Sequence, residues 1–329
     1  MTDKSYNSQL SEKFIINKFL KKLNLDTAGT FNFENDAAYL NFSKNNKIVV
    51  TTDTIVENID FFKKDPPESI AQKIICVNLS DISAMGALPK TYTLNLSISS
   101  NIDHIWLKRF TNQLSKIQKK YNMYLLGGDI SRSKEISVTV TCFGESKLKN
   151  IIKQKNSTIG DDIWVTGDLG NSYLGYKIIK NPKLIIEKKY IKKFKNFFLY
   201  PEPCMFGSKI SKYINSAIDV SDGFYGDLQK MLNDQLGAII FKDSIPISSI
   251  LKKILKDNYK SIKFSDILSW GDDYELIFTS FKKNRKTLFS LARKNKVKIS
   301  LVGTIIKKNG IFDDSLKLIE NISSFDHFC

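Results

Sequence analysis

Residues 91–129 read TYTLNLSISSNIDHIWLKRFTNQLSKIQKKYNMYLLGGD, and this stretch decides the fold class. Residues 91–99 alternate polar and apolar side chains with a period of two, which predicts a strand with one polar face. Residues 105–121 carry apolar side chains at helical spacing, and a short apolar strand then ends in two glycines and an aspartate. A strand, a helix and a second strand in succession are typical of α/β and α+β proteins.

The same alternation of strands and helices extends in both directions along the chain. A polar, lysine-rich stretch at residues 147–158 separates two halves and is typical of a domain junction. We therefore expect two α/β (α+β) domains, at residues 1–148 and 149–329. Further strands are expected at residues 47–53, 136–145, 161–167, 217–220, 274–280 and 297–303, and helices at residues 11–23, 67–84, 172–180, 204–214 and from about 222.

The composition excludes several classes of protein. The chain has 329 residues, of which 42% are hydrophobic, so it can bury a core and is not disordered as a whole. No apolar run approaches the ~18 residues of a membrane-spanning helix, and the first ten residues lack the apolar segment of a signal peptide. The four cysteines form no close pair, so we expect a cytoplasmic protein with free thiols and no membrane partner.

The net charge of +16 raises the question of nucleic-acid binding. Only four of the 50 cationic residues are arginine, whereas specific nucleic-acid sites favour arginine because its planar guanidinium group forms paired hydrogen bonds. The lysines are scattered along predicted helices and loops. We therefore expect a solvated, lysine-rich surface and no nucleic-acid partner.

Aspartates beside small residues are the main functional signal. Several lie at or just beyond the C-terminal end of a predicted strand, and ligands bind at that edge in open α/β sheets. One such aspartate is usually a turn residue or a helix cap, but the whole set favours a binding site. The set comprises Asp36, Asp53, Asp81, Asp129, Asp219, Asp222, Asp272 and Asp273.

Clustered carboxylates need a counter-charge, because like charges at close range raise one another's pKa. Mg²⁺ and Mn²⁺ prefer oxygen ligands and bridge substrate phosphates, so the aspartates predict metal-assisted phosphoryl transfer. The chain lacks a GxxxxGK[ST] loop, the motifs of protein kinases and a GxGxxG after its first strand. The turn TGDLGNS (166–172) is suited to close backbone approach to an anion.

One family has the same segments in the same order and spacing. They are TTDTIVE (51–57), VNLSDISAMGALP (77–89), LLGGD (125–129), AIDVSDG (217–223), GDDYEL (271–276) and FDHF (325–328). From about residue 36 to residue 328, the chain resembles the thiamine-monophosphate kinases of the aminoimidazole-ribonucleotide-synthetase-like ATP-binding superfamily. The resemblance implies an N-terminal ATP- and Mg²⁺-binding domain, whose strands form a barrel across a homodimer, and a C-terminal synthetase-like α/β domain.

The resemblance also implies an activity, ligands and site residues. The activity is phosphorylation of thiamine monophosphate to thiamine diphosphate, with ATP as co-substrate and several Mg²⁺ ions. Because the aspartates are committed to metals, we expect direct in-line transfer without a catalytic acid or base. The implied metal positions are Asp36, Thr51, Thr52, Asp53, Asp81, Asp129, Asp219 and Asp222; the nucleotide positions are Gly128, Asp129 and Ser221; and the substrate positions are Asp60, Asp272 and Phe325.

The chain departs from the family pattern at several of these positions. Asn35 replaces a carboxylate of the first metal motif, and Asp60 stands where the family has a substrate-binding histidine. We expect Asp60 to turn towards a nearby lysine or to contact the cationic ring of the substrate. An arginine that contacts ATP in the family aligns near Gln154, and Asp272 is one methylene shorter than the usual glutamate.

Three alternatives stay open at this point. Another ATP-using enzyme of the superfamily would share part of the aspartate set, although selenophosphate synthetases need a reactive N-terminal cysteine or selenocysteine. A catalytically degenerate homologue would explain Asn35 and Asp60. A lysine-rich nucleic-acid-binding protein would explain the charge but not the carboxylates.

Overall fold

A computed structural model describes residues 11–33, 37–40, 42, 44–181, 183–184, 186–257 and 262–320 of the chain. The chain forms two compact units, of which the first comprises Met1–Ile82 and Leu88–Glu145 and the second Ser83–Ala87 and Ser146–Cys329. The domain boundary expected between residues 148 and 149 stays a prediction. No helix in the described ranges combines the length and the apolar character needed to cross a bilayer.

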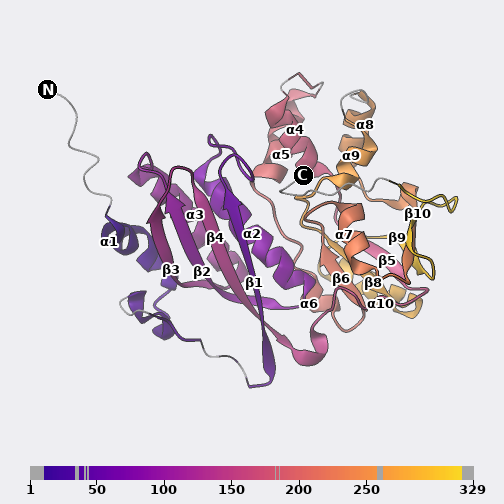
Figure 1. Cartoon of the computed structure of the whole chain (residues 1–329), viewed down its shortest axis with the longest axis horizontal. Helices are drawn as coiled ribbons and strands as arrows, with labels where there is room; N and C mark the ends of the chain where they lie inside the picture. Colours follow the sequence, from indigo (N-terminus) through magenta and orange to yellow (C-terminus); the bar gives the residue numbers. More distant parts are fainter. Residues whose placement is uncertain are drawn as a thin grey trace. The chain divides into compact units, whose positions relative to one another are not determined.

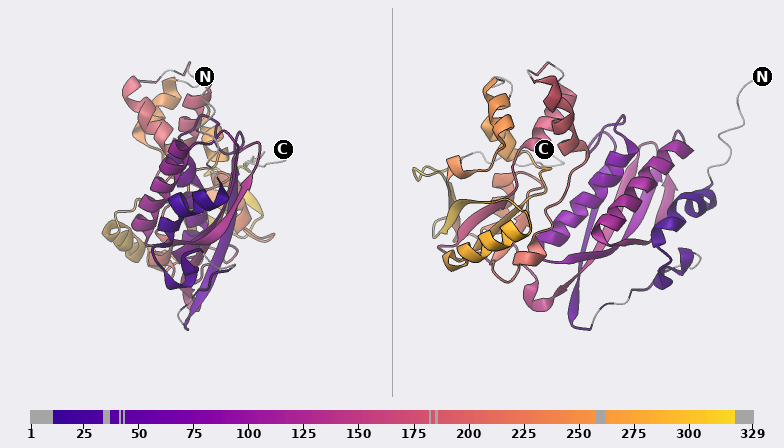
Figure 2. Two further views of the ribbon diagram at one scale, coloured as in Figure 1. Left: turned by 90° about the vertical axis from the view of Figure 1, so that its left-hand side faces the viewer. Right: turned by 180° about the vertical axis from the view of Figure 1, so that it is seen from behind.

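The first unit is built on a four-stranded sheet in the order β1-β4-β2-β3. Strands β2 and β3 run parallel, and β4 runs antiparallel to β2. Helices α2 and α3 cover one face of this sheet (Figures 1 and 2). The elements are β1 (Asn46–Val56), α2 (Pro67–Ala84), β2 (Leu88–Ile98), α3 (His104–Tyr121), β3 (Tyr124–Arg132) and β4 (Ser137–Lys147).

Local sequence signals explain where these helices begin and end. Pro67 is the first residue of α2, where its missing N–H would have no helical partner in any case. Helix α3 follows Asp103, whose side chain accepts a 2.7 Å hydrogen bond from the N–H of Trp106. Its last residue is Tyr121, and the C-cap residue Asn122 has a left-handed conformation with φ of 51°. The helices expected at residues 67–84 and 105–121 are therefore confirmed.

Strand β1 alternates between two environments. Val49 and Ile55 are buried, whereas Ile48 and Val50 are about half exposed, at 48% and 54%. Because side chains on a strand alternate between the two faces, the remaining positions follow the same pattern. Thr51 and Asp53 therefore lie on the helix-covered face with Val49 and Ile55.

Two expected helices differ from the structure. The segment at residues 11–23 is not one α-helix but a short α-helix α1 (Glu12–Ile15), a π-helical turn η1 (Ile16–Leu20) and a 3-10 turn η2 (Lys21–Asn24). Of residues 204–214, only α6 (Gly207–Ile210) is α-helical. The Ser-Lys-Tyr-Ile-Asn-Ser run that follows α6 has weak intrinsic helix propensity, so the helix does not continue.

The second unit contains a six-stranded sheet in the order β10-β7-β9-β5-β8-β6. Strands β7 and β10 pair in parallel, and the other neighbours pair antiparallel. The strands are β5 (Asp162–Thr166), β6 (Ser216–Asp219), β7 (Gly237–Ile240), β8 (Leu276–Ser280), β9 (Ile299–Ile306) and β10 (Gly310–Phe312). The helices are α4 (Asn171–Lys180), α5 (Lys188–Leu199), α6, α7 (Phe224–Met231), α8 (Ser249–Asp257), α9 (Phe264–Ser269) and α10 (Arg285–Lys294).

This second sheet is buried on both faces. Ile163 and Val165 of β5 belong to a core formed with α4, α7, α8 and α9. Trp164, between them, belongs to a separate core formed with α6 and α10. Burial on both faces explains why the central strands β5 and β8 are continuously buried rather than alternating.

Candidate active site

Strand β1 and helix α2 bring together three of the predicted metal positions. The hydroxyl of Thr51 donates a 2.5 Å hydrogen bond to Oδ2 of Asp81. Asp53 lies two residues along β1 on the same face, close enough to Asp81 for their charges to interact. Two carboxylates and a hydroxyl from segments about 30 residues apart therefore meet between β1 and α2.

The raised pKa of Asp53 and its oxygen, unpaired within the described ranges, are typical of a carboxylate that binds a cation. Burial, together with the charge of Asp81, raises the pKa of Asp53 to about 7. Its Oδ2 atom is buried and has no hydrogen-bond partner among the described residues. A buried, unsatisfied carboxylate oxygen beside a second carboxylate is destabilising unless a proton or a metal ion neutralises it.

Thr52 lies on the opposite face of the sheet from Thr51. Its hydroxyl contacts the carbonyl oxygen of Val140 at 3.2 Å and the hydroxyl of Thr141 at 3.0 Å, both on β4. The structure therefore does not bring the side chain of Thr52 to Asp53 and Asp81.

Gly128 and Asp129 lie on β3, at the edge of the same sheet. Gly128 pairs with Leu94 so closely that a Cβ atom would come within 1.8 Å of the Leu94 carbonyl oxygen. Asp129 is exposed and lines, with Gly128, a cavity of about 350 Å³. Apolar side chains such as Leu20 and Leu125 form much of the remaining wall.

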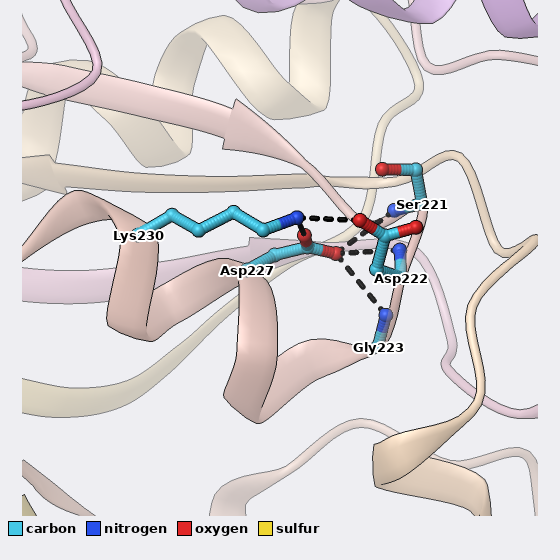
Figure 3. Close-up of polar contacts among 5 residues, drawn as sticks. All are labelled: Ser221, Asp222, Gly223, Asp227 and Lys230. Carbon is cyan, nitrogen blue, oxygen red and sulfur yellow. Dashed lines mark hydrogen bonds and ion pairs between the residues drawn. The ribbon is translucent and has the colours of Figure 1, made fainter. Parts of the chain in front are cut away.

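In the second unit, Asp219 is the last residue of β6, and Ser221 and Asp222 follow in the turn to α7. Asp227 of α7, which the sequence analysis did not select, holds this turn in place (Figure 3). Its Oδ2 atom accepts hydrogen bonds from the N–H groups of Ser221, Asp222 and Gly223 at 3.0, 2.9 and 3.2 Å. A signal for Asp227 was present, because an aspartate in the first turn of a helix often binds backbone N–H groups.

The GDDYEL segment lies directly against this turn. The N–H of Asp272 donates to the carbonyl oxygen of Ser221, and the N–H of Tyr274 donates to that of Val220, both at 2.9 Å. Gly271 packs so tightly that a Cβ atom would lie 1.4 Å from the Ser221 oxygen. Asp272 and Tyr274 both have positive φ, 63° and 51°, and the Tyr274 hydroxyl donates a 2.5 Å hydrogen bond to Asp272.

Asp273 and Glu275 connect this segment to the TGDLGNS turn. The buried carboxylate of Asp273 accepts hydrogen bonds from the N–H of Gly170 at 2.8 and 3.0 Å, at the start of α4. Burial raises the pKa of Asp273 well above its usual range and that of Glu275 to about 7. Together with Asp272 and Lys193, these carboxyl groups line a cavity of about 640 Å³.

Asp60 has a local structural role. Its Oδ2 atom accepts a 2.8 Å hydrogen bond from the N–H of Val56, which closes the turn after β1. Its carbonyl oxygen accepts a 2.9 Å hydrogen bond from Nζ of Lys73, a buried lysine of α2.

The structure thus gathers the predicted site residues into several groups. Thr51, Asp53 and Asp81 form one group, and Ser221, Asp222 and Asp272 form another within the second unit. In the part of the chain that the structure describes, no three acidic, histidine or cysteine side chains converge closely enough to hold a metal by themselves. Asp36 and Phe325, like Asn35, lie outside the described residues.

The raised pKa values predict that the metal-free protein loses stability as pH rises from about 4 to about 7. Asp53 and Glu275 titrate near 7 in the folded chain, against about 4 in an unfolded one. Between these values the folded chain holds protons that the unfolded chain has released, so the free energy of unfolding falls as pH rises. Urea denaturation in EDTA across this range should show a shallower decline for Asp53→Asn and for Glu275→Gln. Slopes equal to that of the wild type in both variants would contradict the assignment.

Comparisons with known proteins decide the family. Residues 34–146 match the AIR synthase related protein, N-terminal domain. A thiamine-monophosphate kinase of Buchnera aphidicola subsp. Acyrthosiphon pisum is 38% identical over 325 residues, which cover 95% of this chain and 98% of that protein. The chain belongs to the thiamine-monophosphate kinase family.

Solved structures of thiamine-monophosphate kinases have the same fold. One from Stenotrophomonas maltophilia superimposes with a TM-score of 0.79 at 29% identity, covering 87% of this chain and 90% of that one. A structure of AaThiL complexed with AMPPCP and TMP gives a TM-score of 0.77 at 26% identity, with coverages of 89% and 91%. The resemblance to this family and the α/β fold expected from the sequence are therefore confirmed.

Proposed function

We propose that the protein transfers a phosphoryl group from ATP to thiamine monophosphate, giving thiamine diphosphate. The observation that carries the proposal is the partly buried Asp53–Asp81 carboxylate pair, because such a pair suits neutralisation by the divalent cations of phosphoryl transfer. Family membership over 95% of the chain supports the choice of substrate. The AaThiL structure, which holds AMPPCP and TMP, supports a site that accepts both ligands.

The donor groups of the chain fit Mg²⁺. Asp53 offers a buried oxygen without a partner among the described residues, and Asp81 and the Thr51 hydroxyl stand beside it. Bound Mg²⁺ would neutralise the phosphates and align the attacking and leaving oxygens. The proposed positions for several Mg²⁺ ions are Asp36, Thr51, Thr52, Asp53, Asp81, Asp129, Asp219 and Asp222. For Thr52 the proposal means the backbone carbonyl oxygen, because the side chain lies on the opposite face of the sheet.

We assign ATP to Gly128, Asp129 and Ser221. Both Gly128 and Asp129 line the largely apolar cavity of the first unit, which suits a flat base. Ser221 donates its N–H to Asp227, and its carbonyl oxygen accepts from Asp272. Because both backbone polar groups of Ser221 are already hydrogen-bonded, we assign the contact with the nucleotide to its hydroxyl.

Thiamine monophosphate carries a cationic thiazolium ring, and the carboxyl-lined cavity at Asp272 suits a cation. We assign Asp272, Phe325 and Asp60 to this substrate, with Phe325 as a stacking surface for a flat ring. The substrate's phosphate is already an anionic nucleophile near neutral pH, so alignment can replace a general base. We therefore propose direct in-line transfer.

A direct assay tests the proposal. Purified protein is incubated with Mg-ATP and thiamine monophosphate, and thiamine diphosphate is measured by chromatography. Product formation that stops in excess EDTA and returns with added Mg²⁺ is the expected result, because the chain has no P-loop lysine to replace the metal. Full activity in EDTA would refute the metal-assisted mechanism.

The same preparation separates the remaining alternatives. A folded protein that binds AMPPCP but forms no product would indicate a degenerate homologue. ATP turnover with a different acceptor would indicate another enzyme of the superfamily. Retention on immobilised DNA at ~0.2 M salt, where nonspecific binding weakens sharply, would indicate a nucleic-acid-binding protein.

We also propose a cytoplasmic homodimer joined through the open face of the first sheet. This face carries the half-exposed Ile48 and Val50 and the exposed hydroxyl pair of Thr54 and Thr139. A half-apolar sheet face that none of the described helices covers supports the barrel formed by two subunits that the family resemblance implies.

Val50→Lys is expected to shift the protein to monomers, because it places a charge in the middle of the proposed interface. Analytical ultracentrifugation measures the change in mass. Ile105→Lys is the matched control, since Ile105 is equally apolar and 66% exposed but lies on α3. A Val50→Lys protein that sediments as a dimer would refute this interface.

A further inference from the structure

Lys230 forms ion pairs with two carboxylates at the turn between β6 and α7 (Figure 3). Its Nζ atom lies 2.5 Å from Oδ2 of Asp222 and 2.7 Å from Oδ1 of Asp227. The two carboxylates differ greatly in environment, because the Asp227 side chain is fully buried and the Asp222 side chain is 35% exposed. One ammonium group therefore joins a buried anion to a solvent-accessible one.

Asp227 is fixed in this arrangement. One of its oxygens receives three backbone N–H groups, and the other receives Lys230. Removing Lys230 would leave a buried carboxylate without its counter-ion, which is strongly unfavourable. Lys230 is therefore held near the turn by Asp227, whatever happens at Asp222.

Asp222 is held much less firmly. Its side chain is partly solvated, and the ion pair with Lys230 joins two side chains that are 35% and 42% exposed. Exposed ion pairs contribute about 0–1 kcal/mol, so a divalent cation can replace the ammonium group at little cost. The oxygen that now receives Lys230 is one of the two through which Asp222 would bind Mg²⁺.

We propose that Lys230 is an exchangeable counter-ion that sets the Mg²⁺ affinity of Asp222. Without the metal, the ammonium group neutralises Asp222; when Mg²⁺ binds, Asp222 releases Lys230, and Asp227 retains it. The inference rests on the proposed function only in taking Asp222 as a metal ligand. It assigns Lys230 a role in tuning that site, because the retained ammonium repels the metal and competes for the same oxygen.

The test measures Mg²⁺ binding rather than turnover. Thermal unfolding of the protein with a fixed concentration of AMPPCP is followed while Mg²⁺ is titrated, and the half-maximal Mg²⁺ concentration is recorded. Lys230→Met should lower this concentration about three- to tenfold while lowering the melting temperature of the metal-free protein. Lys230→Arg, which keeps the charge, should stay near the wild type.

Two controls make the result specific. Lys253→Met removes another lysine that pairs with a carboxylate, Glu187, on the surface of the same unit, and it should leave the Mg²⁺ midpoint unchanged. In a protein that already carries Asp222→Asn, adding Lys230→Met should shift the midpoint much less, because the competition for Asp222 is then lost and only the charge repulsion remains. An unchanged or higher midpoint in Lys230→Met alone, or a wild type that shows no Mg²⁺ response, overturns the proposal.

These outcomes are distinguishable from failure of the proposed function. Thiamine diphosphate formation by a wild type whose Mg²⁺ midpoint does not depend on Lys230 refutes the exchange and leaves the function standing. A Lys230-dependent midpoint in a protein that forms no thiamine diphosphate refutes the function and leaves the exchange standing.

Discussion

Asp53→Asn is expected to lower turnover at least about 100-fold while making the metal-free protein more stable. The carboxylate is buried, its pKa is raised to about 7, and one of its oxygens is unsatisfied within the described part of the chain. A neutral amide removes the charge repulsion with Asp81, so the free energy of unfolding should rise by about 1–3 kcal/mol at pH 8. The same amide cannot replace the charge that a divalent cation requires.

The two readouts must move in opposite directions. Steady-state assays with Mg-ATP and thiamine monophosphate give turnover, and urea denaturation in EDTA gives stability. Asp26→Asn is the matched control, because Asp26 is an exposed residue of the same unit whose positive φ asparagine accepts readily. Near-wild-type turnover, or a less stable metal-free variant, would reject the assignment of Asp53 as a metal ligand.

Asp227→Asn should destabilise the protein by about 2–4 kcal/mol and lower turnover at least about tenfold. The amide retains one oxygen for the three N–H groups of the turn, but its NH₂ group would then face the Lys230 ammonium instead of neutralising it. The turn that carries Ser221 and Asp222 would lose its fixed position. The Michaelis constant for ATP should therefore rise along with the loss of turnover.

Asp234→Asn provides the control for this second substitution. Asp234 lies a few residues after α7 and is exposed, so its loss should change stability by less than about 0.5 kcal/mol. Circular dichroism at low temperature shows whether the Asp227→Asn protein remains folded. A folded variant with an unchanged Michaelis constant for ATP would mean that Asp227 stabilises the unit without positioning the turn.

The elements that could be predicted from the sequence are those with strong local signals. Helix α2 has a proline at its start and a continuous apolar pattern, and its expected range of 67–84 matches the structure. Helix α5 was not predicted, although Phe194 and Phe198 have helical spacing, because its first eight residues include five lysines and the apolar pattern is correspondingly sparse. The mixed α, π and 3-10 geometry of residues 12–24 depends on tertiary packing and has no local signal.

The candidate site also has features that could be predicted from the sequence and features that could not. The motif order selects the aspartates as site candidates, and the structure brings two of them, Asp53 and Asp81, close together. The sequence could not show which face of the sheet each side chain occupies. Thr51 and Thr52 are adjacent and chemically alike, yet only Thr51 contacts Asp81. Asp227 was missed because the only signal for it, an aspartate in the first turn of a helix, is common in proteins and does not show that the bound N–H groups belong to the Ser221–Gly223 turn.

The three N–H groups bound by Asp227 have a consequence for the thermodynamics of ligand binding. A turn that an internal carboxylate already orders loses its conformational freedom when the protein folds, not when a ligand arrives. The unfavourable entropy of nucleotide binding should then contain little contribution from residues 221–223. Calorimetry would register this preorganisation as a smaller entropic penalty in the wild type than in a variant whose turn has been loosened.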